Sequence, residues 1–299
     1  MSTHAPDTIL RHTAMNVRTS VLCLIACLLG AQTEAQDAPA EKAARQPSAE
    51  DRFEIRNLEG WTLYINRDVP QQYPEQTEKT LEHLGWELYQ IKLATPALAV
   101  CNMQENNAIW IEYQEEVDLS YHPDRSWLID RGYTIPRDPP SFMSLSVKTH
   151  VGDSYIRYCS NSEQLIREGV NPDKLGAVEI RDPPSMLKWA LLQQSDVLHE
   201  LALAYYDRHA AKEDSELGKK IQAAYEQARE DGQYKSVLRF DGQRVPHPAL
   251  VSERHYFAEL MESYFLVNDH YPFIRCELKD QDSAGYALIA GLWEGNPHR

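Results

Sequence analysis

The spacing of apolar and polar residues along the chain predicts a domain of mixed strands and helices. Apolar and polar residues alternate in residues 53–57 and 61–66 around a Glu59-Gly60 turn, which is typical of a β-hairpin. A short apolar run at residues 109–113 indicates another strand. From about residue 74 to 93, apolar residues recur every three or four positions, as on one face of a helix: Leu81, Leu84, Leu88 and Ile91.

The second half of the chain is dominated by helical spacing. A helix is predicted from Met186 to about Arg208, and a second from about residue 215 to 230. Ser252 is a plausible N-cap for a third helix that continues to Phe265. The apolar stripe of the first of these helices places His199 at the edge of a core-facing side: Leu187, Leu191, Leu198, Leu201, Ala202 and Tyr205.

The segment from His199 to Leu203 matches part of a zinc-peptidase motif. In the pattern His-Glu-x-x-His, two histidines four residues apart lie on one side of a helix and bind one Zn²⁺, and the glutamate activates the metal-bound water. Here Glu200 is present, but Leu203 stands where the second histidine would be. A leucine has no lone pair to donate. Taken alone, His199 and Glu200 would more often be a partly buried histidine beside a solvated glutamate.

A second pair of candidate residues follows downstream. His255 and Glu259 are four residues apart and therefore share a helix face. By itself such a pair is more often a solvated surface contact, and its place after the His199-Glu200 pair is what draws attention to it. His247, in the preceding loop, is a candidate for a substitute metal ligand.

Length, composition and charge narrow the class of protein. The chain has 299 residues, of which 42% are hydrophobic, enough to form the core of one large domain or two small ones. Its formal charge is −15, and it contains no long run of Lys or Arg, so we do not expect it to bind nucleic acid.

The N-terminal stretch has the pattern of an export signal. Arg11 and Arg18 precede an apolar run at residues 21–31, and small residues precede a cleavage position after residue 35. The run is too short to span a bilayer, which takes about 20 residues, so no transmembrane segment is expected in the mature chain. We predict a signal peptide at 1–35, a flexible leader at 36–52 and one domain at 53–295, in a protein that is secreted or held in the periplasm or cell envelope. A lipid anchor at Cys27 is the less favoured alternative, because the apolar run continues beyond it.

Three cysteines follow the predicted signal peptide: Cys101, Cys159 and Cys276. Their wide spacing and odd number give no disulfide framework and no metal-binding Cys pair. One bridge with a spare thiol and three unbridged cysteines packed as small hydrophobes both remain open.

Three segments together resemble a known family: residues 199–205, residues 256–259 (Tyr-Phe-Ala-Glu), and residues 268–273 (Asn-Asp-His-Tyr-Pro-Phe). They are similar to secreted bacterial zinc metallopeptidases related to the catalytic domain of anthrax toxin lethal factor. Residues 109–113, 121–128 and 169–180 extend the resemblance over most of 53–293, with an insertion at about 134–168. It implies an α+β, zincin-like metallopeptidase domain, in which a small mixed sheet flanks an active-site helix packed on a second ligand-bearing helix.

The resemblance also implies a role for each matching residue. His199 would be the first zinc ligand, Glu200 the general base, and Glu259 a carboxylate that orients a ligand imidazole. Three positions depart from the pattern: the second ligand is Leu203, the third is His255 in place of a glutamate, and a tyrosine that would stabilise the oxyanion aligns with Pro248. Imidazole binds Zn²⁺ as readily as carboxylate does, whereas the loss of the second histidine leaves too few strong ligands. We therefore expect Zn²⁺ to bind weakly or not at all.

Two functional hypotheses follow, with a structural alternative. The first is a catalytically impaired metallopeptidase-like protein, a pseudoenzyme, that keeps a cleft for a peptide or protein partner lined by the strand Ile109-Trp110-Ile111. The second is an active metal-dependent peptidase with an unusual ligand set of His199, His255 and possibly His247, and with Glu200 as general base. In the third, the domain is a stable exported scaffold in which Leu203 packs as core against Phe257 or Leu260.

Overall fold

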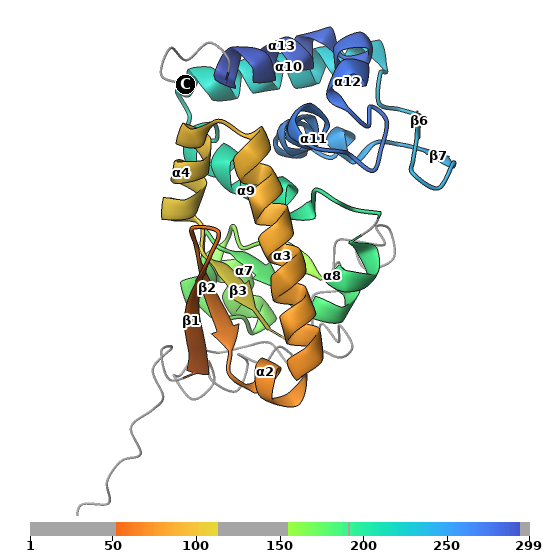
Figure 1. Cartoon of the computed structure of the whole chain (residues 1–299). Helices are drawn as coiled ribbons and strands as arrows, with labels where there is room; N and C mark the ends of the chain where they lie inside the picture. The colour runs from red at the N-terminus through yellow and green to blue at the C-terminus, as the bar shows by residue number, and fades with distance from the viewer. Residues whose placement is uncertain (1–51, 113–154, 191, 294–299) are drawn as a thin grey trace, which may run out of the picture. The chain divides into compact units, whose positions relative to one another are not determined.

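A five-stranded mixed sheet in the order β1-β2-β3-β5-β4 forms one layer of the domain (Figure 1). The computed structural model describes residues 52–112, 155–190 and 192–293. β1 (Phe53–Leu58) and β2 (Trp61–Asn66) are antiparallel, while β2, β3 (Ile109–Ile111) and β5 (Val178–Ile180) run parallel. β4 (Ile156–Tyr158) pairs with β5 in the antiparallel direction. The predicted α+β class with a small mixed sheet is confirmed.

Helices make up most of the remaining described residues. The predicted helix at 74–93 is confirmed as α3, and the hairpin turns at Glu59 and Gly60, whose φ angles of 54° and 101° are both left-handed. The helices are α2 (Asp68–Gln72), α3 (Pro74–Ala94), α4 (Ala97–Asn106), α7 (Ser162–Glu168), α8 (Pro183–Trp189), α9 (Asp196–His209), α10 (Glu216–Asp231), α11 (Glu253–Phe265), α12 (Arg275–Gln281) and α13 (Ser283–Trp293). Two 3₁₀ turns, η1 (Pro172–Lys174) and η2 (Pro248–Leu250), and a ribbon of β6 (Val237–Leu238) and β7 (Arg244–Val245) complete the list.

The expected single helix from Met186 to Arg208 is wrong, because the chain forms two helices there. α8 ends at Trp189 and α9 begins at Asp196. Between them, the hydroxyl of Ser195 donates to the carbonyl of Val267 at 2.6 Å, which anchors the start of α9 beside the end of α11. A polar Gln-Gln-Ser-Asp stretch at residues 193–196 thus starts a new helix rather than continuing the first.

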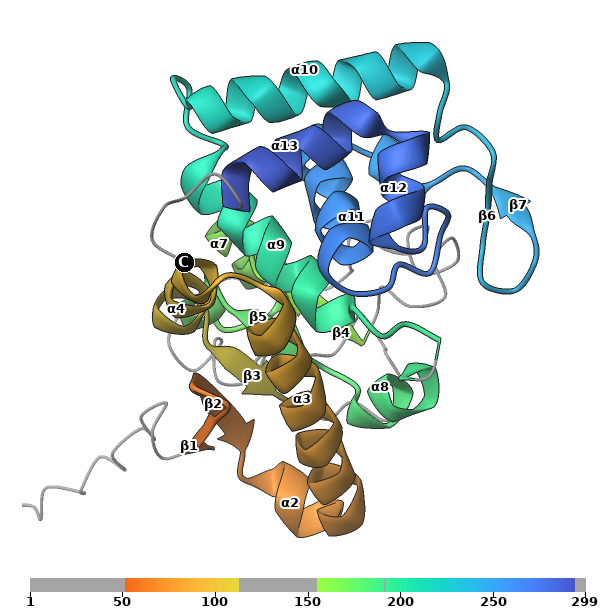
Figure 2. The same cartoon turned by 45° about the horizontal axis from the view of Figure 1, so that its top comes forward.

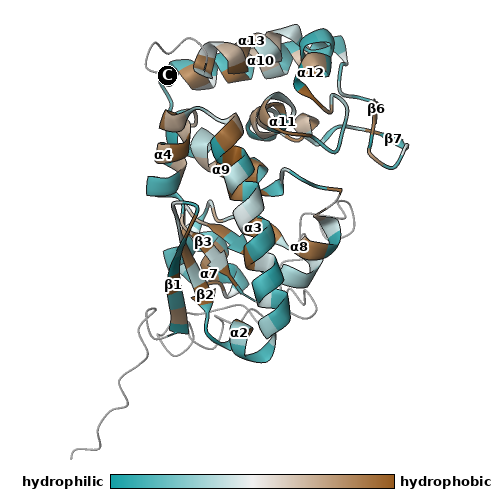
Figure 3. Cartoon of the chain, in the orientation of Figure 1, coloured by the Kyte–Doolittle hydropathy of each residue, from teal (hydrophilic) through white to brown (hydrophobic). Residues whose placement is uncertain are grey.

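The main core is formed by the sheet, α9 and α11. α9 packs on β4 and β5, α11 packs on α9, and α10 and α13 cover the far side of α11 (Figure 2). Strand residues on one face of the sheet point into this core: Leu63, Ile65, Ile109, Ile111, Ile156, Val178 and Ile180. Much of the strands and of α9 is hydrophobic, drawn in brown, whereas α2 and the neighbouring end of α3 are largely hydrophilic, drawn in teal (Figure 3). α9 is therefore held from both sides, by the sheet and by α11.

The opposite face of the sheet buries a set of charged side chains that we call the sheet-face ion network. Lys174 is 0% exposed, and its Nζ lies 2.8 Å from Glu112 Oε1 and 2.7 Å from Glu179 Oε1. Arg157 bridges Glu179 at 2.8 Å and Glu168 at 2.5 Å. Each carboxylate of this network therefore contacts a permanent cation, as buried charges require.

Several expectations about chain organisation fall partly or wholly outside the described residues. The signal peptide and the leader do so, as does most of the insertion at 134–168. The described end of that stretch contains β4 and α7, and β4 belongs to the main sheet. None of the helices in the described ranges is both long and apolar enough to cross a membrane. Cys101, Cys159 and Cys276 are free thiols, and burial raises the pKa of Cys159 to about 12.

Candidate functional site

α9 presents a histidine and a glutamate on a helix whose other side is buried in the core. Val197, Leu198 and Leu201 are each 0% exposed and fix the rotation of the helix. His199 and Glu200 lie at the margin of this stripe, where they are only partly buried. The predicted position of His199 at the edge of a core-facing side is confirmed.

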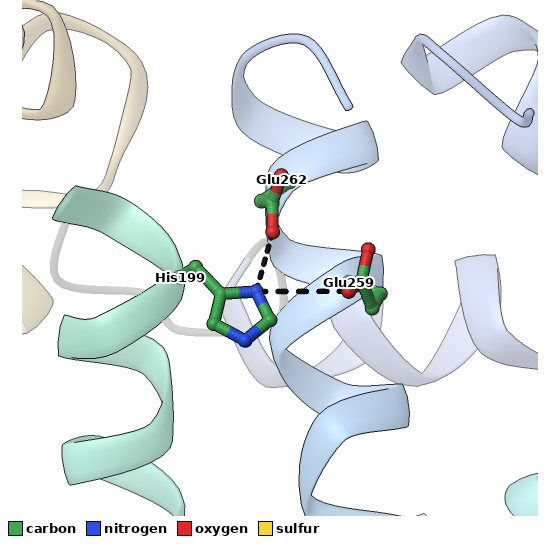
Figure 4. Close-up of side chains that lie close together, drawn as sticks. All are labelled: His199, Glu259 and Glu262. Atoms are coloured by element: carbon green, nitrogen blue, oxygen red, sulfur yellow. Dashed lines mark hydrogen bonds and ion pairs between the residues drawn. The ribbon is translucent and has the colours of Figure 1, made fainter. Parts of the chain in front are cut away.

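α11 supplies two carboxylates that face His199. Its N-terminus is capped as predicted, since the hydroxyl of Ser252 accepts from the His255 amide at 3.3 Å. Glu259 and Glu262 are three residues apart and so lie on the same side of the helix. His199 Nδ1 lies 2.5 Å from Glu262 Oε1 and 3.8 Å from Glu259 Oε1 (Figure 4).

The imidazole of His199 is oriented by these two contacts. Its Nδ1 points at the carboxylates, and its Nε2 points away from both (Figure 4). The ring of His255 lies 6.1 Å from that of His199 between centroids, and His255 Nδ1 is within 2.9 Å of the Ser252 hydroxyl. The expected proximity of His199, His255 and Glu259 is therefore present, with Glu262 as an additional and closer partner of His199.

Glu259 lies in an enclosed and electrically negative environment. The residue is 5% exposed, and its Oε2 accepts from Asn268 Nδ2 at 2.7 Å. Burial holds the pKa of Glu259 well above its ordinary value, and the neighbouring Glu262 raises the pKa further, whereas His199 lowers it. The pKa of Asp196, at the start of α9, is also raised well above its ordinary value, mainly by burial. We call His199, Glu259, Glu262 and Asp196 the interhelical cluster.

His247, the expected substitute ligand, borders this cluster but is already engaged. Its Nδ1 accepts from the Ala249 amide at 3.1 Å, which caps η2, and lies 3.9 Å from Glu259 Oε2. Burial lowers the pKa of His247 well below its ordinary value, so the imidazole is neutral and carries its proton on Nε2. His247 therefore has no free lone pair for a metal ion in this arrangement.

Glu200, the expected general base, is held by the edge of the sheet. Its Oε2 accepts from the backbone N–H of Tyr158 in β4 at 2.6 Å. Tyr158 pairs with Val178 of β5, and its N–H points away from that partner strand, toward α9. The carboxylate thus accepts a hydrogen bond from the strand next to it.

The ligand set implied by the family resemblance does not fit these residues. Leu203 is 6% exposed and belongs to the same buried cluster as Phe257 and Leu260, so an apolar side chain occupies the position of the second ligand. Pro248 begins η2 and carries no hydroxyl in place of the expected tyrosine. His199 and His255 alone are fewer than the three protein ligands of a catalytic zinc site.

Ile109-Trp110-Ile111 was expected to line a substrate cleft as an edge strand, and this expectation is wrong. This segment is β3, which pairs with β2 on one side and β5 on the other, and its residues are 0%, 4% and 1% exposed. A strand with neighbours on both sides has no free backbone groups for an extended peptide. Within the described ranges, β4 is the strand that lies next to α9 and has one partner only.

Sequence reasoning missed Glu262, Asn268 and Tyr158. Glu262 could have been predicted, because it is three residues after Glu259 and therefore on the same helix face. Asn268 belongs to a segment noted only for its resemblance, and the amide of Tyr158 has no signature in a sequence.

Comparisons with known proteins give no independent identification. No family model, no curated protein and no solved structure matches this chain. The resemblance to lethal-factor-like metallopeptidases therefore rests on the residue pattern, and any function has to follow from the site itself.

Proposed function

We propose that the protein is an exported, metallopeptidase-like pseudoenzyme that binds an extended peptide or protein segment without hydrolysing it. The observation that carries the proposal is the position of Leu203, which fills the second ligand site with a buried apolar side chain. The hydrogen bond from Tyr158 to Glu200 adds support, because it engages the carboxylate that a hydrolase would use on water.

Peptide binding is supported by the placement of β4. This strand runs antiparallel to β5, packs against α9, and has a partner on one side only within the described ranges. An extended peptide adding to such an edge bonds to backbone groups that point outward. Here the outward N–H of Tyr158 is bound by Glu200, so an incoming carbonyl would compete with that carboxylate.

Binding and hydrolysis are tested on one set of probes. A mixed library of internally quenched fluorescent peptides is incubated with the protein, with and without added Zn²⁺, and both cleavage and retention of peptides are measured. We expect retention without cleavage. Tyr158→Pro removes the outward N–H at an edge position that tolerates proline, and should abolish retention, whereas the matched variant Tyr158→Phe keeps the N–H and should retain peptides. Retention that is equal in both variants would contradict pairing at β4.

Hydrolysis with a changed ligand set is the second candidate. The observation in its favour is the 6.1 Å separation of the His199 and His255 rings, because two imidazoles that share one Zn²⁺ at about 2.0–2.1 Å keep their centroids within roughly 6 Å. Under this alternative, cleavage occurs in the library assay, and Glu200→Gln abolishes cleavage while bound metal stays in place. Cleavage that survives Glu200→Gln would rule this alternative out.

A further inference from the structure

We propose that the interhelical cluster binds a divalent transition-metal ion through His199 Nδ1, Glu259 and Glu262, a ligand set that differs from the one the family resemblance implies. The inference goes beyond the proposed peptide binding and does not depend on it. One ligand atom from each of these three residues can be chosen so that all lie within 4.8 Å of one another. The three side chains come from two helices that pack directly together (Figure 4).

The ligand spacing is close to what a small cation needs. A tetrahedral ion bound at about 2.0–2.2 Å separates its ligand atoms by roughly 3.3–3.6 Å. The distances from His199 Nδ1 to the two carboxylates, 2.5 Å and 3.8 Å, bracket this range. An ion bound here would replace the direct contact between His199 Nδ1 and Glu262 Oε1, and these two atoms would separate by roughly 1 Å.

The charge balance of the cluster also favours a cation. Glu259 and Glu262 are 5% and 6% exposed, and the contacts of Glu259 in the described ranges are with His199, His247 and Asn268, none of which carries a permanent charge. A buried carboxylate in such surroundings must become protonated or bind a metal ion.

An independent observation comes from Asp196, one turn before His199 on α9. Its Oδ2 is buried and has no hydrogen-bond partner, and burial, followed by the charges of Glu87 and then Glu262, raises the pKa of its carboxyl group. A buried carboxylate oxygen without a donor is rare in folded proteins, and such groups are found where ions or waters bind. Asp196 is therefore a further buried carboxyl group at the start of α9, near the proposed ligand Glu262.

The donor set indicates which class of ion would bind. One imidazole nitrogen and two carboxylate oxygens suit Zn²⁺, Co²⁺ or Mn²⁺, whereas Ca²⁺ takes six to eight oxygen ligands. Glu262 is not among the residues that the family resemblance assigns to zinc. The ring of His255, which that assignment would include, lies 6.1 Å from the ring of His199 between centroids, and its Nδ1 is within 2.9 Å of the Ser252 hydroxyl.

Metal content and ligand identity are tested together. The full chain is equilibrated with a slight excess of Zn²⁺, desalted and analysed by mass spectrometry, and Co²⁺ affinity is followed through its visible absorption bands. We expect near-stoichiometric metal in the wild type and in His255→Ala. Glu262→Gln and His199→Ala should weaken binding by more than about 100-fold, because each removes a direct ligand.

The nitrogen of His199 that binds the ion tests the proposed geometry. Imidazole ¹⁵N chemical shifts of the Zn²⁺-loaded protein should show His199 bound through Nδ1 with its proton on Nε2. A thermal unfolding scan verifies that each variant is folded, and the ¹⁵N spectrum of the wild type decides the question if Glu262→Gln does not fold. Absence of bound metal, metal on Nε2, or loss of metal in His255→Ala would each overturn the proposal. None of these outcomes affects the peptide-retention assay, so the two proposals can fail separately.

Discussion

The protein buries two sets of charged side chains. One lies on the face of the sheet opposite the main core and the other between α9 and α11, and their charges are paired differently. In the sheet-face ion network, Lys174 contacts Glu112 and Glu179, and Arg157 contacts Glu179 and Glu168. In the interhelical cluster, the carboxylates of Glu259 and Glu262 face a histidine, whose charge depends on a proton.

The difference distinguishes a set of charges that is paired within the chain from one for which we propose ion binding. A network in which every buried carboxylate contacts a permanent cation is complete in the folded chain and needs nothing from outside. Within the described ranges, the buried carboxylate of Glu259 contacts only groups without a permanent charge, so its negative charge has to be offset by a proton or a bound cation. The sheet-face ion network therefore fixes η1 and β4 on the sheet, and the interhelical cluster is the better candidate for binding.

The largest expected loss of stability comes from removing a cation from the sheet-face ion network. Lys174→Met leaves Glu112 and Glu179 buried without their shared cation, and should lower the free energy of unfolding by about 3–5 kcal/mol. Denaturant unfolding of the full chain measures this. The matched variant Lys219→Met removes an exposed lysine that pairs with Glu216, and should change stability by less than about 0.5 kcal/mol. A loss below about 1 kcal/mol in Lys174→Met would contradict a structural role for this network.

A smaller loss of stability is expected from changes at Leu203 of α9, the position that the family resemblance assigns to a zinc ligand. Leu203→His places a polar ring in an apolar site and should destabilise the protein by about 1–3 kcal/mol, whereas Leu203→Met should cost less than about 1.5 kcal/mol. We expect added Zn²⁺ to leave the thermal stability of Leu203→His unchanged relative to wild type. Recovery of stability with Zn²⁺, together with new hydrolysis of the peptide library, would favour the peptidase alternative.

In the interhelical cluster, removal of the Glu259 charge should change stability little. In metal-free protein at neutral pH, Glu259→Gln keeps an oxygen that accepts from Asn268 and removes a carboxyl group whose pKa the neighbouring Glu262 raises. Its stability should change by no more than about 1 kcal/mol, in the stabilising direction. Denaturant unfolding checks this against Glu179→Gln, which weakens contacts to both Lys174 and Arg157 and should be clearly destabilising. Equal losses in the two variants would remove the distinction between the two sets of charges.

The smallest expected effect is a pH dependence of stability that comes from Glu87, which belongs to neither of the two sets of charges. Burial raises the pKa of Glu87 in α3 above 4.5, although the contact with His83 acts in the opposite direction. A carboxyl with a raised folded-state pKa contributes stability that is present below pH 4.5 and is lost as pH rises through the folded-state pKa. Glu87→Gln removes the titrating group and should flatten this fall, whose slope for one carboxyl is at most about 1.4 kcal/mol per pH unit. Unfolding midpoints measured across pH test it, with the exposed Glu82→Gln as a control that should keep the wild-type slope.

The sequence by itself determined the elements whose signals are local. The hairpin around Gly60, the apolar face of α3 and the Ser252 cap of α11 each depend on residues within a few positions of one another. Backbone hydrogen bonding and side-chain periodicity act over the same short range, which is why these elements were predicted closely. The edge position of His199 on α9 follows from the same periodicity.

Tertiary structure decided which of these elements meet. The contact between His199 and Glu262 joins residues 63 positions apart, and the hydrogen bond between Tyr158 and Glu200 joins residues 42 apart. The interior place of β3 depends on strands that precede and follow it at a distance, and the start of α9 depends on a contact between Ser195 and Val267. Such contacts are set by the packing of whole elements against a shared core, which local spacing does not encode.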